Sequence, residues 1–237
     1  MIKQPESRWA AFAIHLGLSA AIFVVLAAII VVFWYPGFLF QTDGGWQGIR
    51  LIAGIDLVLG PLLTLIVYDK GKKSLKADLS VIAAIQFSAL FAGTYLVYQE
   101  RPIAVIFADD KFSTVSQNSF KFHGLDPYEN SLMRAEKPVW LYVPTPLTQS
   151  EHEMARLQQS HLDQRRYQPL ENHNQQLKML GATSIPDHDP LEESSALRYY
   201  PILSRYYEGH LVLNTNTLTV EQLILGRSTD DFGINAQ

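Results

Sequence analysis

The sequence predicts a membrane protein with three N-terminal transmembrane α-helices followed by a small α+β domain in the periplasm. Three observations lead to this fold class. Apolar runs of twenty or more residues occur three times within the first hundred positions, and a helix needs about 20 such residues to cross the hydrocarbon core of a bilayer. A lysine-rich loop separates the second run from the third. The remaining chain is polar and carries short alternating segments that are typical of strands.

The first apolar run covers residues 10–34 and is interrupted only by His15 and Ser19. A cleavable signal peptide is the alternative, but its apolar region would be about 7 to 15 residues long. This run is longer, and the sequence Phe-Trp-Tyr-Pro at residues 33–36 is typical of an interfacial aromatic belt followed by a helix breaker. We therefore expect an uncleaved, tilted first span, with a tight interfacial loop over residues 37–47.

The second run, residues 49–68, contains an acid and a proline. An ionised carboxylate at the depth of Asp56 costs roughly 2.5 to 3.5 kcal/mol, so this side chain should face protein or water rather than lipid. Pro61 lacks an amide hydrogen and leaves the carbonyl group of Leu57 in need of another partner. We expect one face of this helix to pack closely against other helices, because small and polar residues recur there at helical spacing: Ala53, Asp56, Gly60 and Thr64.

The loop at residues 69–78 is strongly basic, and the third apolar run follows at residues 79–98. Positively charged segments next to membrane spans stay on the cytoplasmic side. The predicted topology therefore has the N-terminus inside and the C-terminal domain outside, in the periplasm of a bacterium. The residues that set this orientation are Lys70, Lys72, Lys73 and Lys76 in the loop, with Lys3 and Arg8 in the N-terminal head, against Arg50 and Arg101 on the other side.

Charge divides the chain into two parts, residues 1–98 and 99–237, which we predict to be the transmembrane region and the periplasmic domain. The first part has 7 Lys and Arg against 5 Asp and Glu, whereas the second has 12 against 18. Neither part shows the concentrated basic surface that nucleic-acid binding requires, so we expect no nucleic-acid partner. The chain has no cysteine, which excludes disulfides, thiol nucleophiles and thiolate metal sites.

The periplasmic part is predicted to mix strands and helices. Overlapping capping boxes at residues 148–151 and 150–153 predict a helix that runs to about Tyr167. A second helical piece over residues 170–180 should end at Gly181, and a loop should follow over residues 182–195. The segment after Gly226 is polar and expected to be loose. Strands are predicted at residues 103–108, 111–115, 139–143, 202–207, 210–214 and 218–225.

The polar residues inside the predicted spans form the most interesting set. His15 and Ser19 share a face of the first span. Counting ~1.5 Å per residue from the cytoplasmic edge places His15 and Gln86 roughly 8 to 11 Å deep, level with Thr64, whereas Asp56 lies at roughly 18 Å. Three interpretations remain open: hydrogen bonding within the three-helix bundle, a site for the transmembrane helix of another protein, and a path for protons or ions.

No pattern in the second part predicts an active site, and we expect no catalytic residue, metal site or cofactor. Asp109 and Asp110 follow the first strand, where carboxylates could act as acid and base, but a charged turn is the simpler interpretation. The sequence Asp-His-Asp at residues 187–189 has metal-compatible side chains without a partner at useful spacing. Phosphate-loop, nucleophile-elbow and zinc-protease motifs do not occur. Three further histidines are expected to be solvated: His152, His161 and His173.

Two segments of the chain resemble a known family. The first segment reads G-x-D-x-x-x-G-P-L-L-T over residues 54–64, and the second reads K-S-L-K-x-D-L over residues 73–79. With the Phe-Trp-Tyr-Pro end of the first run and the sequence of residues 101–115, they resemble the type IV pilin accessory proteins of the TfpX/TfpZ type over about the first 115 residues. The resemblance implies an inner-membrane protein that assists a major pilin in stability or assembly. It implies no enzymatic activity and no cofactor.

The leading hypothesis is thus a pilin chaperone in the inner membrane, with the type IV major pilin as partner and other pilus assembly components as further candidates. The spans would dock the pilin transmembrane helix, and the periplasmic domain would hold the pilin head. A membrane-anchored periplasmic sensor that binds a ligand is the alternative, and a tethered enzyme based on Asp109 and Asp110 is a third. The residues expected to dock the partner helix are Asp56, Gly60, Pro61, Thr64, His15, Ser19 and Gln86.

Overall fold

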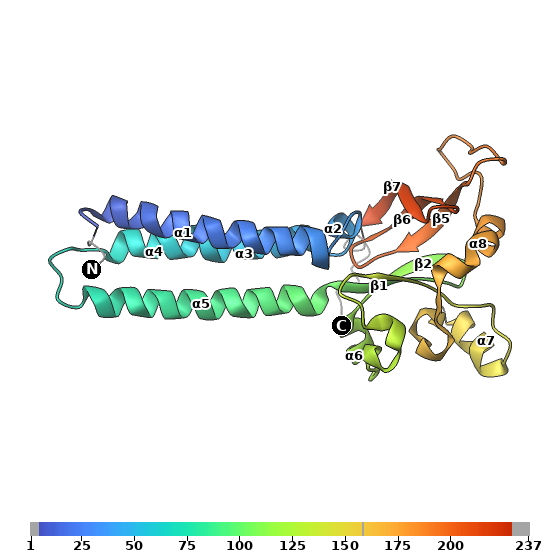
Figure 1. The fold of residues 1–237 in the computed structure, drawn as a ribbon, viewed down its shortest axis with the longest axis horizontal. Coiled ribbons are helices and arrows are strands. Elements are labelled where there is room, and N and C mark those ends of the chain that lie inside the picture. The colour runs from blue at the N-terminus through green and yellow to red at the C-terminus, as the bar shows by residue number, and fades with distance from the viewer. Residues whose placement is uncertain (1–4, 158, 229–237) are drawn as a thin grey trace. The chain divides into compact units, whose positions relative to one another are not determined.

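The computed structural model describes residues 5–157 and 159–228 and consists of two compact units (Figure 1). The helical unit comprises the chain up to Gly37 together with Gly45–Gln99. The sheet domain comprises Phe38–Gly44 and the chain from Glu100 onward. Lys3 and most of the tail predicted to be loose lie outside the described residues.

Three long helical stretches make up the helical unit, and all three are long and apolar enough to cross a membrane. The third begins four residues earlier than predicted. Ser7 caps the first stretch, because its hydroxyl accepts a hydrogen bond from the Ala10 amide at 3.1 Å. The stretches are α1 (Arg8–Ile29) with the π-helix η1 (Ile30–Trp34), then α3 (Gly45–Ala53), the π-helix η2 (Gly54–Leu59) and α4 (Gly60–Val67), and finally α5 (Leu75–Glu100).

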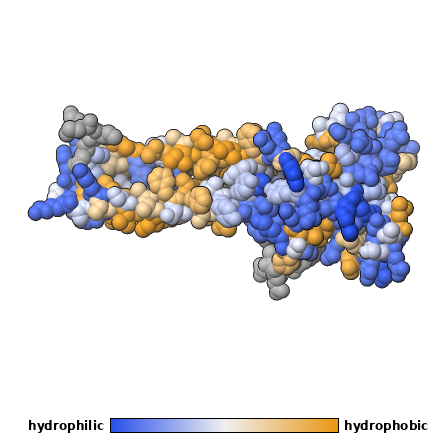
Figure 2. All heavy atoms as spheres, turned by 60° about the horizontal axis from the view of Figure 1, so that its bottom comes forward, coloured by the Kyte–Doolittle hydropathy of each residue, from blue (hydrophilic) through white to orange (hydrophobic). Residues whose placement is uncertain are grey.

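The outer surface of the helical unit is apolar. Figure 2 shows apolar residues gathered over the long helices, whereas polar residues dominate the sheet domain. Large apolar side chains point outward along all three stretches, among them Val24, Ile66 and Phe91, which is 76% exposed. Such a surface is suited to lipid and would be unfavourable in water.

The connection between the first two stretches differs from the prediction of a tight interfacial loop. Residues 38–44 belong to the sheet domain, where α2 (Leu39–Thr42) forms a short helix. Leu39 is buried in the core of the sheet domain, and the carbonyl of Thr42 accepts a hydrogen bond from the Tyr206 amide at 3.1 Å. Asp43 is also buried and accepts a hydrogen bond from the Thr114 hydroxyl at 2.5 Å. The hydrogen-bond partners Thr114 and Tyr206 lie 71 and 164 positions further along the chain, which is why local composition did not reveal these contacts.

The sheet domain is built on one mixed sheet, whose strand order among the described residues is β4-β3-β1-β2-β5-β6-β7. β1 pairs in parallel with β3, and β2 in parallel with β5, while the other neighbours are antiparallel. The strands are β1 (Pro102–Ala108), β2 (Lys111–Ser116), β3 (Val139–Tyr142), β4 (Gln168–Pro169), β5 (Leu197–Leu203), β6 (Tyr207–Asn214) and β7 (Thr219–Ser228).

Apolar layers cover both faces of this sheet. Every residue of β1 is buried, as expected for a central strand. Val105 and Phe107 point to one face, with α8 (Asn174–Leu180), and Ala104 and Ile106 point to the other, with α6 (Gln117–Phe122). The alternation follows from the two-residue period of a strand. The remaining short helical turns are η3 (Pro127–Glu129), η4 (Ser131–Met133), η5 (Ser160–Leu162), η6 (Gln164–Arg166) and η7 (Leu170–His173).

The predicted helix from the capping boxes to Tyr167 is too long. α7 spans Gln149–Arg156 and is followed by the turns η5 and η6. The first capping box is confirmed, since the Thr148 hydroxyl accepts from the Glu151 amide and the Glu151 carboxylate accepts from the Thr148 amide. The helix lacks an apolar stripe, and Leu162 is instead buried against the sheet, so the chain leaves the helical path.

The strand predicted at residues 202–207 lies earlier in the chain. β5 runs over Leu197–Leu203 and is followed by a turn, so the strand begins five residues earlier than predicted. Tyr199 and Tyr200 are buried, and the Tyr200 hydroxyl donates to the Leu177 carbonyl of α8 at 2.6 Å. The alternating apolar pattern that predicts a strand is absent here, because Arg198 stands next to the two tyrosines. The burial of Tyr200 depends on α8, which lies upstream, whereas the Tyr199 hydroxyl donates to the Asp189 carbonyl at 2.8 Å.

Candidate functional site

Polar side chains from all three long stretches meet inside the helical unit. The Ser19 hydroxyl of α1 donates to Asp56 Oδ1 of η2 at 3.0 Å. Gln86 Nε2 of α5 donates to the same carboxylate oxygen at 2.7 Å and lies 3.3 Å from the Ser19 hydroxyl oxygen. A second link joins His15 Nδ1 to the Thr64 hydroxyl oxygen at 2.6 Å. These five residues, His15, Ser19, Asp56, Thr64 and Gln86, form what we term the polar cluster.

Three members of the polar cluster are buried: Asp56, which is 1% exposed, Ser19 and Thr64. His15 and Gln86 are partly buried. Hydrogen bonding within the bundle, one of the three interpretations left open by the sequence, therefore accounts for most of these groups. The expected level of His15 with Thr64 is confirmed by their hydrogen bond.

Gln86 differs from its expected position, because it reaches Asp56 rather than Thr64. The hydrogen bond places Gln86 level with Asp56 inside the helical unit. That position depends on how α5 packs against the second stretch, which a residue count along each helix does not show.

Asp56 lies in a π-helical turn directly before Pro61. The segment η2 ends at Leu59, and α4 restarts at Gly60 with Pro61 in its first turn. Leu59 and Gly60 are both helical, so the chain enters α4 without leaving the helical path. The missing amide of Pro61 therefore leaves a carbonyl of the preceding turn without its usual donor. π-helical turns also widen a helix and occur frequently at functional sites. The local sequence thus interrupts this helix at the acid.

Gly60 makes room for Gln86. A Cβ atom at position 60 would lie 2.0 Å from Gln86 Oε1, which no real contact allows. Gly48 and Gly93 face Val97 and Ile55 at similarly close range, 2.9 and 3.2 Å from their nearest atoms. Glycines at these positions let the helices approach closely. By contrast, Gly54 meets nothing within 4 Å and has no such packing role.

A cavity of about 310 Å³ lies beside the polar cluster, lined by residues of α1, η2, α4 and α5. Its wall is apolar, with Ile14, Ile22 and Phe87 among the lining residues, and includes every member of the cluster. Two buried acceptor atoms, Asp56 Oδ2 and Gln86 Oε1, have no hydrogen-bond partner among the described residues. Since a buried polar atom without a partner is costly, these two atoms point to a missing donor.

Two tyrosines at the ends of the first two helical stretches also join the helices. The Tyr35 hydroxyl donates to the Val97 carbonyl at 3.0 Å, and the Tyr68 hydroxyl donates to the Pro5 carbonyl at 2.7 Å. Both side chains are buried. The carbonyl groups that they reach belong to distant parts of the chain, so the sequence did not indicate these contacts.

In the sheet domain, Asp109 and Asp110 form the turn between β1 and β2, with φ of +51° and +60°. Both oxygens of Asp109 accept hydrogen bonds from Ser160, from its hydroxyl at 2.7 Å and its amide at 3.3 Å. The predicted charged turn is confirmed. The Asp-His-Asp sequence at residues 187–189 is exposed, and His188 Nδ1 lies 3.0 Å from the Pro186 carbonyl.

The other histidines of the sheet domain divide into exposed and packed ones. His152 caps its own helix at the Thr148 carbonyl. His173 stacks on Tyr142 with ring centroids 4.1 Å apart and lies 2.7 Å from Gln168 Oε1. Burial lowers the pKa of His173, so the imidazole is held in its neutral form. The expectation of solvated histidines is therefore wrong for His173.

The chain is similar to fimbrial assembly proteins of Dichelobacter nodosus. It is 39% identical over 106 residues to the protein of serogroups C1 and C2, an alignment that covers 44% of this chain and 81% of that protein. The chain belongs to the fimbrial assembly protein family. The family proteins of serogroups I and E1 show the same 39% identity over 106 residues, and there the alignment spans 41% of their length. No protein-family model and no solved structure matches the chain.

Proposed function

We propose that this chain is an inner-membrane accessory protein that stabilises a type IV major pilin and assists its assembly into pili. Membership of the fimbrial assembly protein family supports a role in pilus biogenesis. The names of these relatives refer to assembly and not to a chemical reaction. The proposed role requires no enzymatic activity and no cofactor.

The three long helical stretches support placement in a membrane. In this proposal the loop with Lys70, Lys72 and Lys73 and the start of α5 with Lys76 face the cytoplasm. Lys72 pairs with Asp78 at 2.6 Å, but all four lysines still favour this orientation, because acidic residues contribute little to the rule. The sheet domain then lies in the periplasm, where it can hold the head of the pilin while the helical unit holds the pilin helix.

The observation that carries the docking proposal is the cavity beside the polar cluster with its two acceptors that lack donors. A partner helix that presents an apolar side chain and a hydrogen-bond donor would fill this cavity and satisfy Asp56 Oδ2 or Gln86 Oε1. Hydrogen bonds between helices in membranes contribute about 0.6 to 2 kcal/mol each. Contacts of this size favour reversible holding, which suits a protein that must release its partner.

Site-specific photocrosslinking tests this docking face. A photoreactive residue at Phe87, which lines the cavity and is 63% exposed, is compared with one at Val81, which lies on the same helix, is 57% exposed and does not line the cavity. With the pilin present in the same membrane, we expect pilin adducts from position 87 and few from position 81. Equal capture at both positions, or none at either, would contradict the proposed docking face.

Substitution of Asp56 tests the same proposal in cells. We expect Asp56→Leu to lower pilin levels and piliation while the protein itself still accumulates, since the acceptor for the partner is lost. Val58→Leu, at an exposed position two residues away, is the control. If Asp56→Leu makes the protein disappear from the membrane, Asp56 acts only in holding the helices together.

A further inference from the structure

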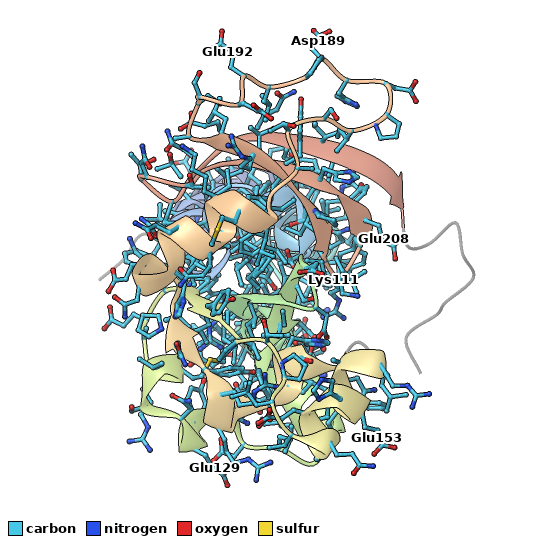
Figure 3. The ribbon with its side chains drawn as sticks, turned by 90° about the vertical axis from the view of Figure 1, so that its right-hand side faces the viewer. Lys111, Glu129, Glu153, Asp189, Glu192 and Glu208 are labelled. Atoms are coloured by element: carbon cyan, nitrogen blue, oxygen red, sulfur yellow. The ribbon has the colours of Figure 1, made fainter. Side chains whose placement is uncertain are left out.

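A second cavity, of about 360 Å³, opens in the sheet domain at the carboxyl ends of β1 and β3. It is lined by residues of these two strands, of α7, η5 and α8, and of the connecting segments. Figure 3 looks onto this end of the domain, with Lys111, the residue after the β1–β2 turn, near the middle of the view. This cavity is separate from the one beside the polar cluster and shares no lining residue with it.

The charge of the cavity is negative. Asp109 and Asp110 line it, and no basic residue is among the described residues that do so. Ser160 occupies both oxygens of Asp109, whereas the carboxylate of Asp110 has no hydrogen bond or ion pair within the described chain. Arg166 donates to the Pro144 carbonyl at the rim, but its charge is directed to Glu151, 3.6 Å away.

Tyr142 supplies the second observation. This side chain lines the cavity, is only 5% exposed, and its hydroxyl has no hydrogen-bond partner among the described residues. Phe107 and His173 hold the ring by stacking at centroid distances of 5.9 and 4.1 Å. Burial and the negative charge of Asp110 raise the pKa of Tyr142. A neutral hydroxyl is therefore fixed beside a carboxylate that has no counter-ion.

The remaining lining decides what kind of cation fits. Val143, Pro144, Pro146 and Leu180 provide apolar surface around the acid and the phenol. A bare divalent ion such as Ca²⁺ needs six to eight oxygen ligands, and Asp109 is already engaged. A cation on an apolar stem matches the lining better, because its stem covers apolar surface while its charged end reaches Asp110.

We propose that this cavity binds the side chain of a lysine or arginine presented by a partner protein. The cationic end pairs with Asp110 and donates a hydrogen bond to the Tyr142 hydroxyl oxygen, while the aliphatic stem lies against Leu180 and the two prolines. The site lies outside the helical unit, so it does not depend on the docking of a partner helix.

The test is a titration of the full-length protein in detergent with Nα-acetyl-lysine methylamide as the probe. The readout is the resonance of tyrosine labelled with ¹³C at Cζ, with the signal of Tyr142 assigned by its loss in Tyr142→Phe. We expect a saturable shift with this probe and none with the same compound acetylated at Nε. Asp110→Asn keeps the left-handed backbone that asparagine tolerates and should weaken binding by about tenfold, the effect of losing one charged hydrogen bond.

The control is Glu153→Gln, which removes a charge from the outer side of α7, where Figure 3 shows Glu153 pointing away from the domain. This variant should bind the lysine probe like the wild type. The proposal is overturned if both probes shift the resonance equally, if Asp110→Asn binds as well as the wild type, or if calcium chloride produces the saturable shift in place of the lysine probe.

Discussion

The two units differ in what they expose, since the helical unit turns large apolar side chains outward and buries a polar cluster, whereas the sheet domain buries an apolar core and exposes charged side chains. Asp56 and Ser19 are buried between helices while Phe91 points outward. In the sheet domain, Phe112 is fully buried, and carboxylates such as Glu129 and Glu153 point outward in Figure 3. Different kinds of side chain therefore hold the two units of the chain together.

The difference follows from the surroundings that each unit is suited to. In water, burial of apolar area drives association at roughly 25 cal/mol per Å². Among lipid tails that force is absent between helices, so close packing at small residues and interhelical hydrogen bonds decide which faces meet. Gly60 and Asp56 provide these features in the helical unit. Substitutions in each unit, each with a matched control in the same unit, test this difference.

The largest effect is expected in the core of the sheet domain. Phe112 is fully buried and contacts Phe107, Trp140 and Tyr200 at ring distances of 4.9, 5.6 and 5.4 Å. Phe112→Ala should lower the free energy of unfolding by about 3 to 5 kcal/mol, because the apolar contacts are lost and a cavity remains. Urea unfolding of the protein in detergent, followed by near-UV circular dichroism, measures this change.

Phe122→Ala is the matched control for that measurement, since Phe122 is 72% exposed. Its effect should stay within about 0.5 kcal/mol. If the two phenylalanine variants lost similar stability, apolar burial would not be what holds the sheet domain together.

An intermediate effect is expected at Gly60 in the helical unit. The added methyl group of Gly60→Ala would displace Gln86 and break its 2.7 Å hydrogen bond to Asp56, which should cost about 1 to 3 kcal/mol. Thermal unfolding in detergent, followed by far-UV circular dichroism, measures the loss. Gly17→Ala is the control, because a Cβ at position 17 meets nothing within 4 Å and alanine favours the helix there.

A second substitution separates steric displacement from other causes. If Gln86 is the obstacle, adding Gln86→Ala to Gly60→Ala should cost less than the sum of the two single changes, since the longer side chain is no longer present to be displaced. Strict additivity of the two changes would show that Gly60 is required for a reason unrelated to Gln86.

The smallest effect concerns how the stability contributed by Asp43, in the segment at residues 38–44, depends on pH. Burial raises the pKa of Asp43, partly offset by hydrogen bonds from Thr114 and Thr42. Above the ordinary aspartate pKa of about 4, the folded protein therefore binds a proton that the unfolded chain has lost. The contribution of Asp43 to stability falls as the pH rises from this value through the raised pKa.

Asp43→Asn should remove that part of the pH profile. The gain in stability of the variant over the wild type should be largest at neutral pH and should disappear as the pH is lowered toward 4. Urea midpoints of both proteins at pH 4.5 and 7.5 provide the measurement. Parallel profiles for the two proteins would mean that Asp43 titrates alike in the folded and unfolded states.

Much of the helical unit could be predicted from local composition. Three apolar runs of sufficient length lead to three helices, because helix length and membrane thickness are both set by geometry. The stripe with Asp56, Gly60 and Thr64 correctly indicated the packed face. The π-helical turn around Asp56 was not predicted, and neither was the start of α5 at Leu75 or the contact of Gln86 with Asp56.

In the sheet domain, prediction succeeded where strands are apolar and central, as in β1, β2 and β3. It failed where distant contacts decide the outcome. In the strand Leu197–Leu203, Tyr200 is buried against α8, and the end of α7 is determined by the burial of Leu162. Neither contact leaves a periodic pattern in its own segment.

The number of apolar helices, the positions of the central strands and the polar residues that could meet inside the helices followed from local sequence, because those features depend on neighbours along the chain. Three other features required the folded structure: Phe38–Gly44 belongs to the sheet domain, Gln86 reaches Asp56, and Tyr142 and Asp110 line the same cavity. Each of these joins residues at least 30 positions apart, and such contacts depend on how whole elements pack.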